Sequence, residues 1–121
     1  MEIRTLGNIP VREQGGEKRL YHLFDKVEVI ITHVPAGHIQ PYHRHEEISE
    51  LYYVIEGTVI AHEGNDSWTI AQGESFLLSP SMEYHTVSNP TDTTAILATV
   101  KLKPAEDSCP ELFKRDKQAK D

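Results

Sequence analysis

The stretch 37–57 constrains the fold of this chain more than any other, because it holds metal-ligand side chains at the spacing of a β-strand. His43 and His45 are two residues apart, so in a strand both imidazoles point to one face, roughly 7 Å apart at Cα, where they can converge on one ion. Glu50 breaks this parity, and a turn or bulge through residues 46–49 must reset the register before its carboxylate can join them. Two imidazoles and one carboxylate suit iron, nickel, copper, zinc or manganese.

A plain alternative exists for this pattern when it is taken alone. With seven histidines and nineteen acidic residues in 121, an isolated His-x-His pair also fits a solvated strand face. A later strand-like stretch carries His85, which supplies a third imidazole if that stretch lies opposite the first pair. Three histidines and one glutamate leave up to two positions of an octahedral ion open, and open positions distinguish a reactive metal site from a structural one.

Length and composition predict one domain over residues 1–121 and exclude several classes of protein. The net charge of -7 and the lack of clustered Lys and Arg argue against a nucleic-acid or anionic-membrane partner. A single cysteine, Cys109, excludes an intrachain disulfide and a cysteine-rich zinc module. No apolar run is long enough to cross a bilayer and no signal-peptide pattern opens the chain, so we expect a cytoplasmic protein.

Short runs with a two-residue apolar period, separated by Gly, Pro, Asn and Asp, predict an all-β sandwich or barrel. The barrel core is expected over about residues 20–102, between an N-terminal arm over 1–18 and a polar C-terminal tail over 104–121. We expect the tail to form a short helical turn or a loose end. The expected strands lie at 19–24, 27–34, 50–56, 58–62, 67–70, 74–78, 84–89 and 94–101.

The strand expected at 50–56 is apolar on both faces, with Tyr52 and Val54 on the side of Glu50 and Leu51, Tyr53 and Ile55 on the other side. Both faces then need cover, one from the core and one from another sheet or another subunit. A homodimer is the expected assembly.

At this point the sequence resembles the cupins, a family with two sequence motifs. The first motif has the form G-x5-H-x-H-x4-E-x6-G, and this chain matches it at every spacing with Gly37, His43, His45, Glu50 and Gly57. The second has the form G-x5-P-x-G-x2-H-x3-N, which is matched by Gly73, Pro80, His85 and Asn89 with one residue inserted before the proline. The resemblance covers roughly residues 20–102, and the complete first motif is a specific signal.

The resemblance implies a small double-stranded β-helix, or jelly-roll barrel, with one divalent transition metal (Fe, Mn, Ni, Zn or Cu) inside it. The implied metal ligands are His43, His45, Glu50 and His85. Met82 departs from the family pattern because it stands where glycine is usual, in the turn before the fourth ligand. That change concerns the geometry of the turn and access to the metal, and it leaves all four ligand positions filled.

Two further residues are candidates for a catalytic acid or base. Tyr52 shares the face of Glu50, where it lines the pocket as a proton donor or packs as a core aromatic residue. His33 lies on an apolar strand face, where it is a core histidine, a support for a ligand, or a general base near the metal. The other inward candidates are mostly Val, Ile, Phe and Leu, so we expect an apolar pocket in which the metal is the main polar group.

Two functions are compatible with this pattern. The first is a metal-dependent enzyme, since similar cupins include dioxygenases, decarboxylases, isomerases and lyases that act on small carboxylate, keto or sugar-type molecules. The second is a non-catalytic, metal-stabilised module that binds or senses a small molecule or sugar. A cluster of non-ligand polar residues on the inward faces would favour the first.

Overall fold

The computed structural model describes residues 1–102 and 117–119, and nearly all of its regular structure is β-strand. One short 3-10 helix, η1 (Leu6–Asn8), precedes the strands. The strands are β1 (Val11–Gln14), β2 (Glu17–Leu23), β3 (Val27–Val34), β4 (His43–His45), β5 (Ser49–Glu56), β6 (Thr58–Glu63), β7 (Asp66–Ala71), β8 (Ser75–Leu78), β9 (His85–Ser88), β10 (Ala95–Leu102) and β11 (Lys117–Ala119).

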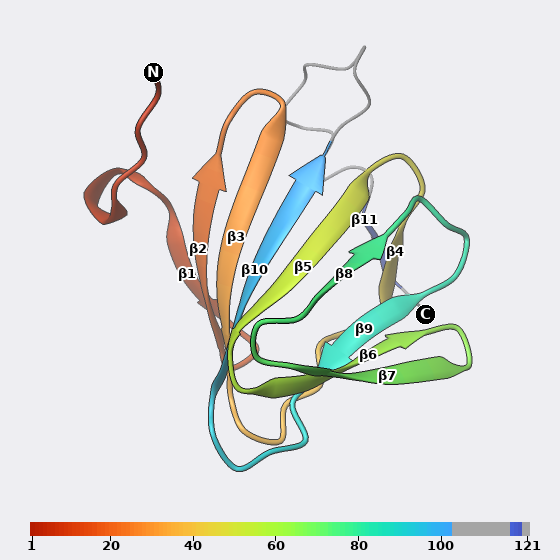
Figure 1. Cartoon of the computed structure of the whole chain (residues 1–121). Helices are drawn as coiled ribbons and strands as arrows, with labels where there is room; N and C mark the ends of the chain where they lie inside the picture. Colours follow the sequence, from red (N-terminus) through yellow and green to blue (C-terminus); the bar gives the residue numbers. More distant parts are fainter. Residues whose placement is uncertain (103–116, 120–121) are drawn as a thin grey trace.

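The strands form two antiparallel sheets that face each other (Figure 1). The larger sheet has the order β1-β2-β3-β10-β5-β8, and the smaller sheet has the order β11-β4-β9-β6-β7. Neighbours in this order are often far apart in the sequence, as with β3 and β10, which is the double-stranded β-helix arrangement predicted from the sequence. The all-β jelly-roll prediction is therefore confirmed.

The core lies between the sheets and is filled by the inward residues of both. Burial in β3 alternates strictly, with Glu28, Ile30, Thr32 and Val34 buried and their neighbours half-buried. The central apolar cluster is small and consists of Val34, Tyr52, Val54, Val59, Val87, Ala95 and Leu97, with Ile70, Phe76 and Leu78 packed against it. One end of the barrel is thus apolar, which leaves the other end to polar side chains.

The sequence-based boundaries agree with the structure to within one or two residues for the eight expected strands, but both ends of the chain differ. The expected N-terminal arm contains β1, and it also contains the start of β2, which continues the larger sheet as a hairpin. In the expected tail, residues 117–119 form β11, which pairs with β4 next to His43 and His45. The prediction of a helical turn or loose end is wrong for that segment, while residues 103–116, with Cys109, lie outside the described residues.

Gly57 shows why the first motif ends in glycine. Its φ of +87° favours glycine, and a Cβ at this position would lie 3.2 Å from Cα of Ala95. The close approach brings the turn between β5 and β6 against the start of β10. Among the described residues, no helix has the length and apolar character needed to span a membrane.

Candidate metal centre

Four buried side chains from both sheets converge in the middle of the barrel. The short strand β4 places His43 and His45 on its inward face, and β9 places His85 directly opposite His43 in register. Glu50 reaches the same point from β5 in the other sheet. Residues 46–48 form the turn that resets the register between β4 and β5, as the spacing predicted.

The ligand atoms of these four residues all lie within 4.8 Å of one another. Oε1 of Glu50 is 3.1 Å from Nε2 of His45 and 3.0 Å from Nε2 of His85. The contacts lack hydrogen-bond geometry, so Oε1 of Glu50 and Nε2 of His85 are buried without a hydrogen bond. Two ligand atoms that are each about 2.1 Å from one ion at a right angle lie about 3.0 Å apart, so the observed separations suit atoms that share a cation.

Neighbouring groups hold these side chains in orientations that suit ligation. Nδ1 of His43 is 3.0 Å from the carbonyl oxygen of Pro41, and by donating to it leaves Nε2 as the acceptor that faces the cluster. The Tyr52 hydroxyl donates to Oε2 of Glu50 at 3.1 Å. This bond occupies one carboxylate oxygen, and Oε1 remains for an ion.

The local electrostatics keep Glu50 ionised and Tyr52 neutral. Burial alone would raise the pKa of Glu50, but contacts with His85 and the charges of His45 and Lys101 outweigh it and lower the pKa to about 2. Burial and the adjacent Glu50 carboxylate raise the pKa of Tyr52 well above its usual value. At neutral pH the cluster therefore offers one anionic oxygen and imidazole nitrogens, a donor set that fits a divalent transition metal.

A small space that borders His43 and Glu50 is polar, which the sequence did not predict. Inward residues of β2, β3, β5 and β10 line a chamber of about 30 Å³ that reaches the cluster. The lining includes the cations Arg19 and Lys101 and the hydroxyl groups of Thr32, Tyr52 and Thr99. Arg19 begins a strand that the sequence predicted, but its place in the chamber wall was not predicted because the pattern of residues 19–24 does not show that Arg19 points inward.

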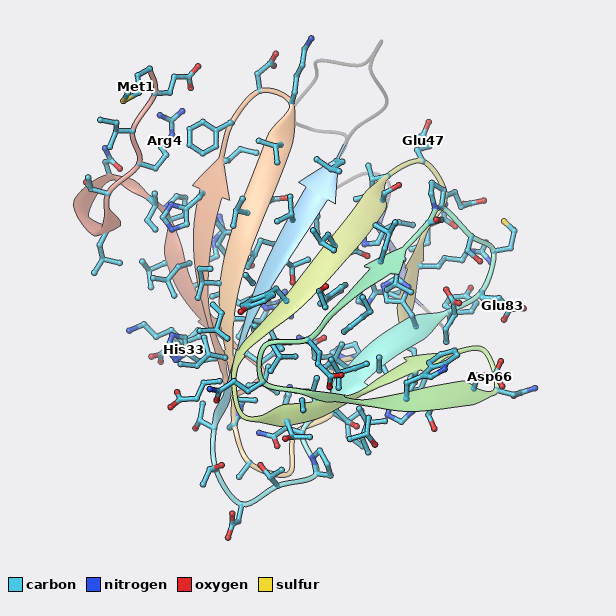
Figure 2. The ribbon with its side chains drawn as sticks, in the orientation of Figure 1. Met1, Arg4, His33, Glu47, Asp66 and Glu83 are labelled. Atoms are coloured by element: carbon cyan, nitrogen blue, oxygen red, sulfur yellow. The ribbon has the colours of Figure 1, made fainter. Side chains whose placement is uncertain are left out.

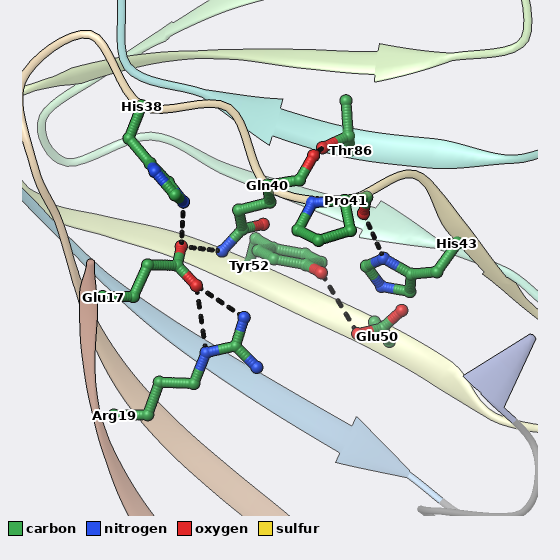
Figure 3. A network of polar contacts seen from close by, with 9 residues as sticks. All are labelled: Glu17, Arg19, His38, Gln40, Pro41, His43, Glu50, Tyr52 and Thr86. Atoms are coloured by element: carbon green, nitrogen blue, oxygen red, sulfur yellow. Dashed lines mark hydrogen bonds and ion pairs between the residues drawn. The ribbon is translucent and has the colours of Figure 1, made fainter. Parts of the chain in front are cut away.

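A buried carboxylate, Glu17, holds Arg19 in the chamber wall (Figure 3). Its Oε1 accepts from Nη2 of Arg19 at 2.5 Å, and its Oε2 accepts from Nε2 of Gln40 at 2.7 Å. Burial lowers the pKa of Arg19, but the charge of Glu17 outweighs burial and raises it. Nε2 of His38 lies 3.6 Å from the same carboxylate, and its side chain is half-buried.

The structure separates the two catalytic candidates. Tyr52 lies in the chamber wall and contacts Glu50, as described above. His33 is half-buried on the opposite face of β3 from Ile30 and Thr32, and Figure 2 shows it on the outer side of the larger sheet. Because alternation turns its imidazole away from the space between the sheets, His33 is not brought to the cluster and a role there as a base has no support.

Met82 proves compatible with the turn before His85. None of the described residues other than glycine has a positive φ, so this turn does not require the glycine that the family motif usually has. The Met82 side chain is exposed, and its carbonyl oxygen accepts from Nη1 of Arg44 at 3.2 Å. The thioether therefore points to solvent and leaves the fourth ligand in place.

Comparison with known proteins agrees with this description. The family model of the cupin domain matches residues 30–101, which is more than half of the chain. No protein with a curated description matches it.

Several solved structures share the fold at low sequence identity. A sugar phosphate isomerase of the cupin superfamily from Silicibacter pomeroyi is 18% identical, with a TM-score of 0.71 over 85% of this chain and 76% of that one. A predicted oxalate decarboxylase from Thermotoga maritima is 17% identical, with a TM-score of 0.75 over 85% of this chain and 100% of that one. An uncharacterised double-stranded β-helix protein from Klebsiella pneumoniae is 21% identical, with a TM-score of 0.70 over 87% and 92%.

We predict that substitution His85→Ala lowers the affinity for a divalent metal at least tenfold, because it removes one of four converging ligands. The matched control is His33→Ala, which removes an outward-facing histidine of the larger sheet. Elemental analysis of protein purified without chelator, followed by zinc titration, checks both variants. Equal metal content in His85→Ala and the wild type would show that the four residues are not the ligand set.

We also predict that Tyr52→Phe lowers metal affinity about tenfold, since a group that orients a metal ligand typically contributes 10-fold to 100-fold. Phenylalanine keeps the ring that stacks on Phe76 and removes only the hydroxyl that donates to Glu50. Competition with a chromogenic chelator measures the affinity, and Tyr53→Phe on the outer face is the control. Unchanged affinity in Tyr52→Phe would mean that the hydroxyl does not support the site.

Proposed function

The chain belongs to the cupin family, and we propose that it is a metal-dependent enzyme that acts on a small, oxygen-bearing anion such as a carboxylate, keto acid or sugar phosphate. The observation that carries this proposal is the polar chamber, in which two cations and a tyrosine hydroxyl lie beside His43 and Glu50, two of the four residues that can hold a metal. A barrel that used a metal only for stability would not need these groups, because burying charges that serve no ligand is costly.

The balance of charge makes recognition of an anion depend on the metal. Two cations, Arg19 and Lys101, face three buried carboxylates, Glu17, Glu28 and Glu50, so the net charge of these groups is about -1 when all are ionised. A divalent ion held by His43, His45, Glu50 and His85 would change the sum to about +1. A bound divalent ion therefore makes the site more favourable for an anion.

The chain's own residues have distinct roles in this proposal. A metal at this site supplies a Lewis acid that polarises a substrate oxygen. Lys101 lies opposite Glu50 in register and Arg19 is fixed by Glu17, so both offer cationic N–H donors to oxygens of the substrate. Tyr52 remains protonated at neutral pH and offers a neutral hydroxyl beside them.

Two of the structural neighbours that are named for a reaction support an anionic substrate. One is called a sugar phosphate isomerase and the other a predicted oxalate decarboxylase, and both names refer to anions. Isomerisation and decarboxylation both build negative charge on a substrate oxygen, which cations and a hydroxyl donor stabilise. We therefore favour these two reaction classes for this chain.

We predict that Lys101→Met weakens the binding of oxalate to the zinc-loaded protein at least tenfold, because it removes one of two cations from the chamber. The matched control is Lys18→Met, since Lys18 is exposed on the larger sheet and should leave binding unchanged. Isothermal titration calorimetry measures the affinity after the zinc content of each variant has been confirmed. Failure of oxalate, malonate and pyruvate to bind even the loaded wild type would contradict the proposed function.

We propose in addition that the chain is a homodimer that pairs the outer faces of its larger sheets. Leu51, Tyr53 and Ile55 are 37%, 45% and 41% exposed on β5. The outward residues of the neighbouring β10, from Ile96 to Val100, are also uncharged. On an acid-rich chain, this face suits a second copy of itself, because a two-fold contact brings identical uncharged patches together without burying a charge.

The dimer predicts that Ile55→Lys converts the protein to a monomer at micromolar concentration, because each interface would then bury two unpaired ammonium groups. The control is Thr69→Lys on the exposed outer face of β7, in the other sheet. Light scattering coupled to gel filtration gives the mass of each variant. A monomeric wild type would contradict this assembly and leave the proposed enzymatic function untouched.

A further inference from the structure

A second cavity opens on the other side of the candidate metal centre. It has a volume of about 350 Å³, and it lies where β7, the last strand of the smaller sheet, faces β8, the last strand of the larger one. Its lining is mainly apolar and includes Ala61, Trp68, Ile70, Phe76, Leu77 and Leu78. The volume is within the range of small-molecule sites and more than twice that of a cavity that accepts benzene.

The register of the strands places this cavity directly beside the ligands. Leu78 of the cavity pairs with Glu50, and Glu63 of the cavity pairs with His85. In β5, Tyr52 belongs to the polar chamber, and its neighbour Phe76 on β8 belongs to the cavity. The two rings stack with centroids 4.7 Å apart and planes 3° apart, so the lining of the chamber and the lining of the cavity meet at this aromatic pair.

The two spaces differ in size and in charge. The chamber of about 30 Å³ has room for about one water-sized group, so it cannot hold a whole metabolite. The cavity is large, and its lining includes His62 and the acidic Glu63, whose carboxylate would repel an anionic group. A ligand of the metal would therefore have its charged head at the cation-lined side and an uncharged body at the other.

We propose that the cavity binds an apolar or aromatic body of the substrate, whose oxygen-bearing, anionic head lies at the metal centre. This inference rests on the proposed function, because that function supplies the head. It adds that the substrate is larger and less polar than oxalate. Trp68, the only tryptophan of the chain and 51% exposed, forms part of the wall that such a body would cover.

The experiment compares malonate with benzylmalonate, two probes with the same chelating head that differ by one benzyl group. The protein is loaded with Zn²⁺, which has no redox chemistry, and affinities are measured by calorimetry. We expect benzylmalonate to bind at least tenfold more tightly, since burial of apolar surface favours the benzyl group. Benzylmalonate should also shift the emission of Trp68, and malonate should not.

A filled cavity provides the matched variant. Ala61→Phe places a ring in the cavity and should abolish the tenfold preference while malonate binds as before. The control Ile60→Phe adds a ring on the outward face of the same strand and should keep the preference. If Ala61→Phe does not fold, the emission of Trp68 in the wild type still tests the proposal.

The outcomes separate this inference from the proposed function. Equal affinity for malonate and benzylmalonate, without a shift in Trp68 emission, would overturn the inference and leave the function standing. Failure of both probes to bind would count against the function itself. Benzylmalonate bound equally by His85→Ala and the wild type would show a cavity that works independently of the metal, which also overturns the inference.

Discussion

The burial of one ionised carboxylate among three imidazoles is the constraint on which the rest of this barrel depends. Glu50 is almost completely buried, yet its pKa is lowered to about 2, so its charge persists inside the protein. An isolated charge at this depth would be too costly to keep. The hydroxyl of Tyr52, the neighbouring imidazoles and the charge of Lys101 compensate it, and these groups come from β4, β5, β9 and β10, which must keep a fixed register. The arrangement of the sheets and the geometry of the site therefore depend on each other.

Compensation for this charge extends beyond the cluster and explains why the interior is polar at one end. Lys101 lies between Glu50 and Glu28 in the strand register, and Arg19 is held by Glu17. Glu17 in turn accepts from Gln40, whose carbonyl oxygen accepts from Thr86 beside His85. A continuous polar network thus joins the beginning of β2 to the ligand strand β9. Such a network fixes ligand positions more firmly than apolar packing, because each hydrogen bond has a preferred direction.

The sequence predicted the features that depend on local spacing and missed those that depend on pairing between distant strands. His43, His45 and Glu50 stand at positions that strand alternation and one turn bring together, and matching the family motif added His85. Glu17 follows a Gly-Gly turn in the expected polar arm and Arg19 begins the next expected strand, and only the pairing of β2 with β3 shows that both point inward. The prediction that His33 lies near the metal was wrong for a related reason. Its face of β3 looked like the core because it is apolar, whereas the buried face carries Glu28 and Thr32.

That inversion of polarity follows from the position of β3 in the sheet. Its outward face is apolar because it belongs to a broad uncharged surface shared with β10 and β5, and its inward face is polar because it borders the metal chamber. The usual rule that the more apolar face of a strand points to the core assumes a barrel filled only with hydrocarbon. Here the interior contains a charged centre, so polar residues point inward around the chamber. Apolar residues form a separate cluster that includes Val54 and Leu97. A strand with acidic and hydroxyl residues on one face and Val and Ile on the other can therefore bury its polar face. This happens where the polar face borders a metal site, as in β3.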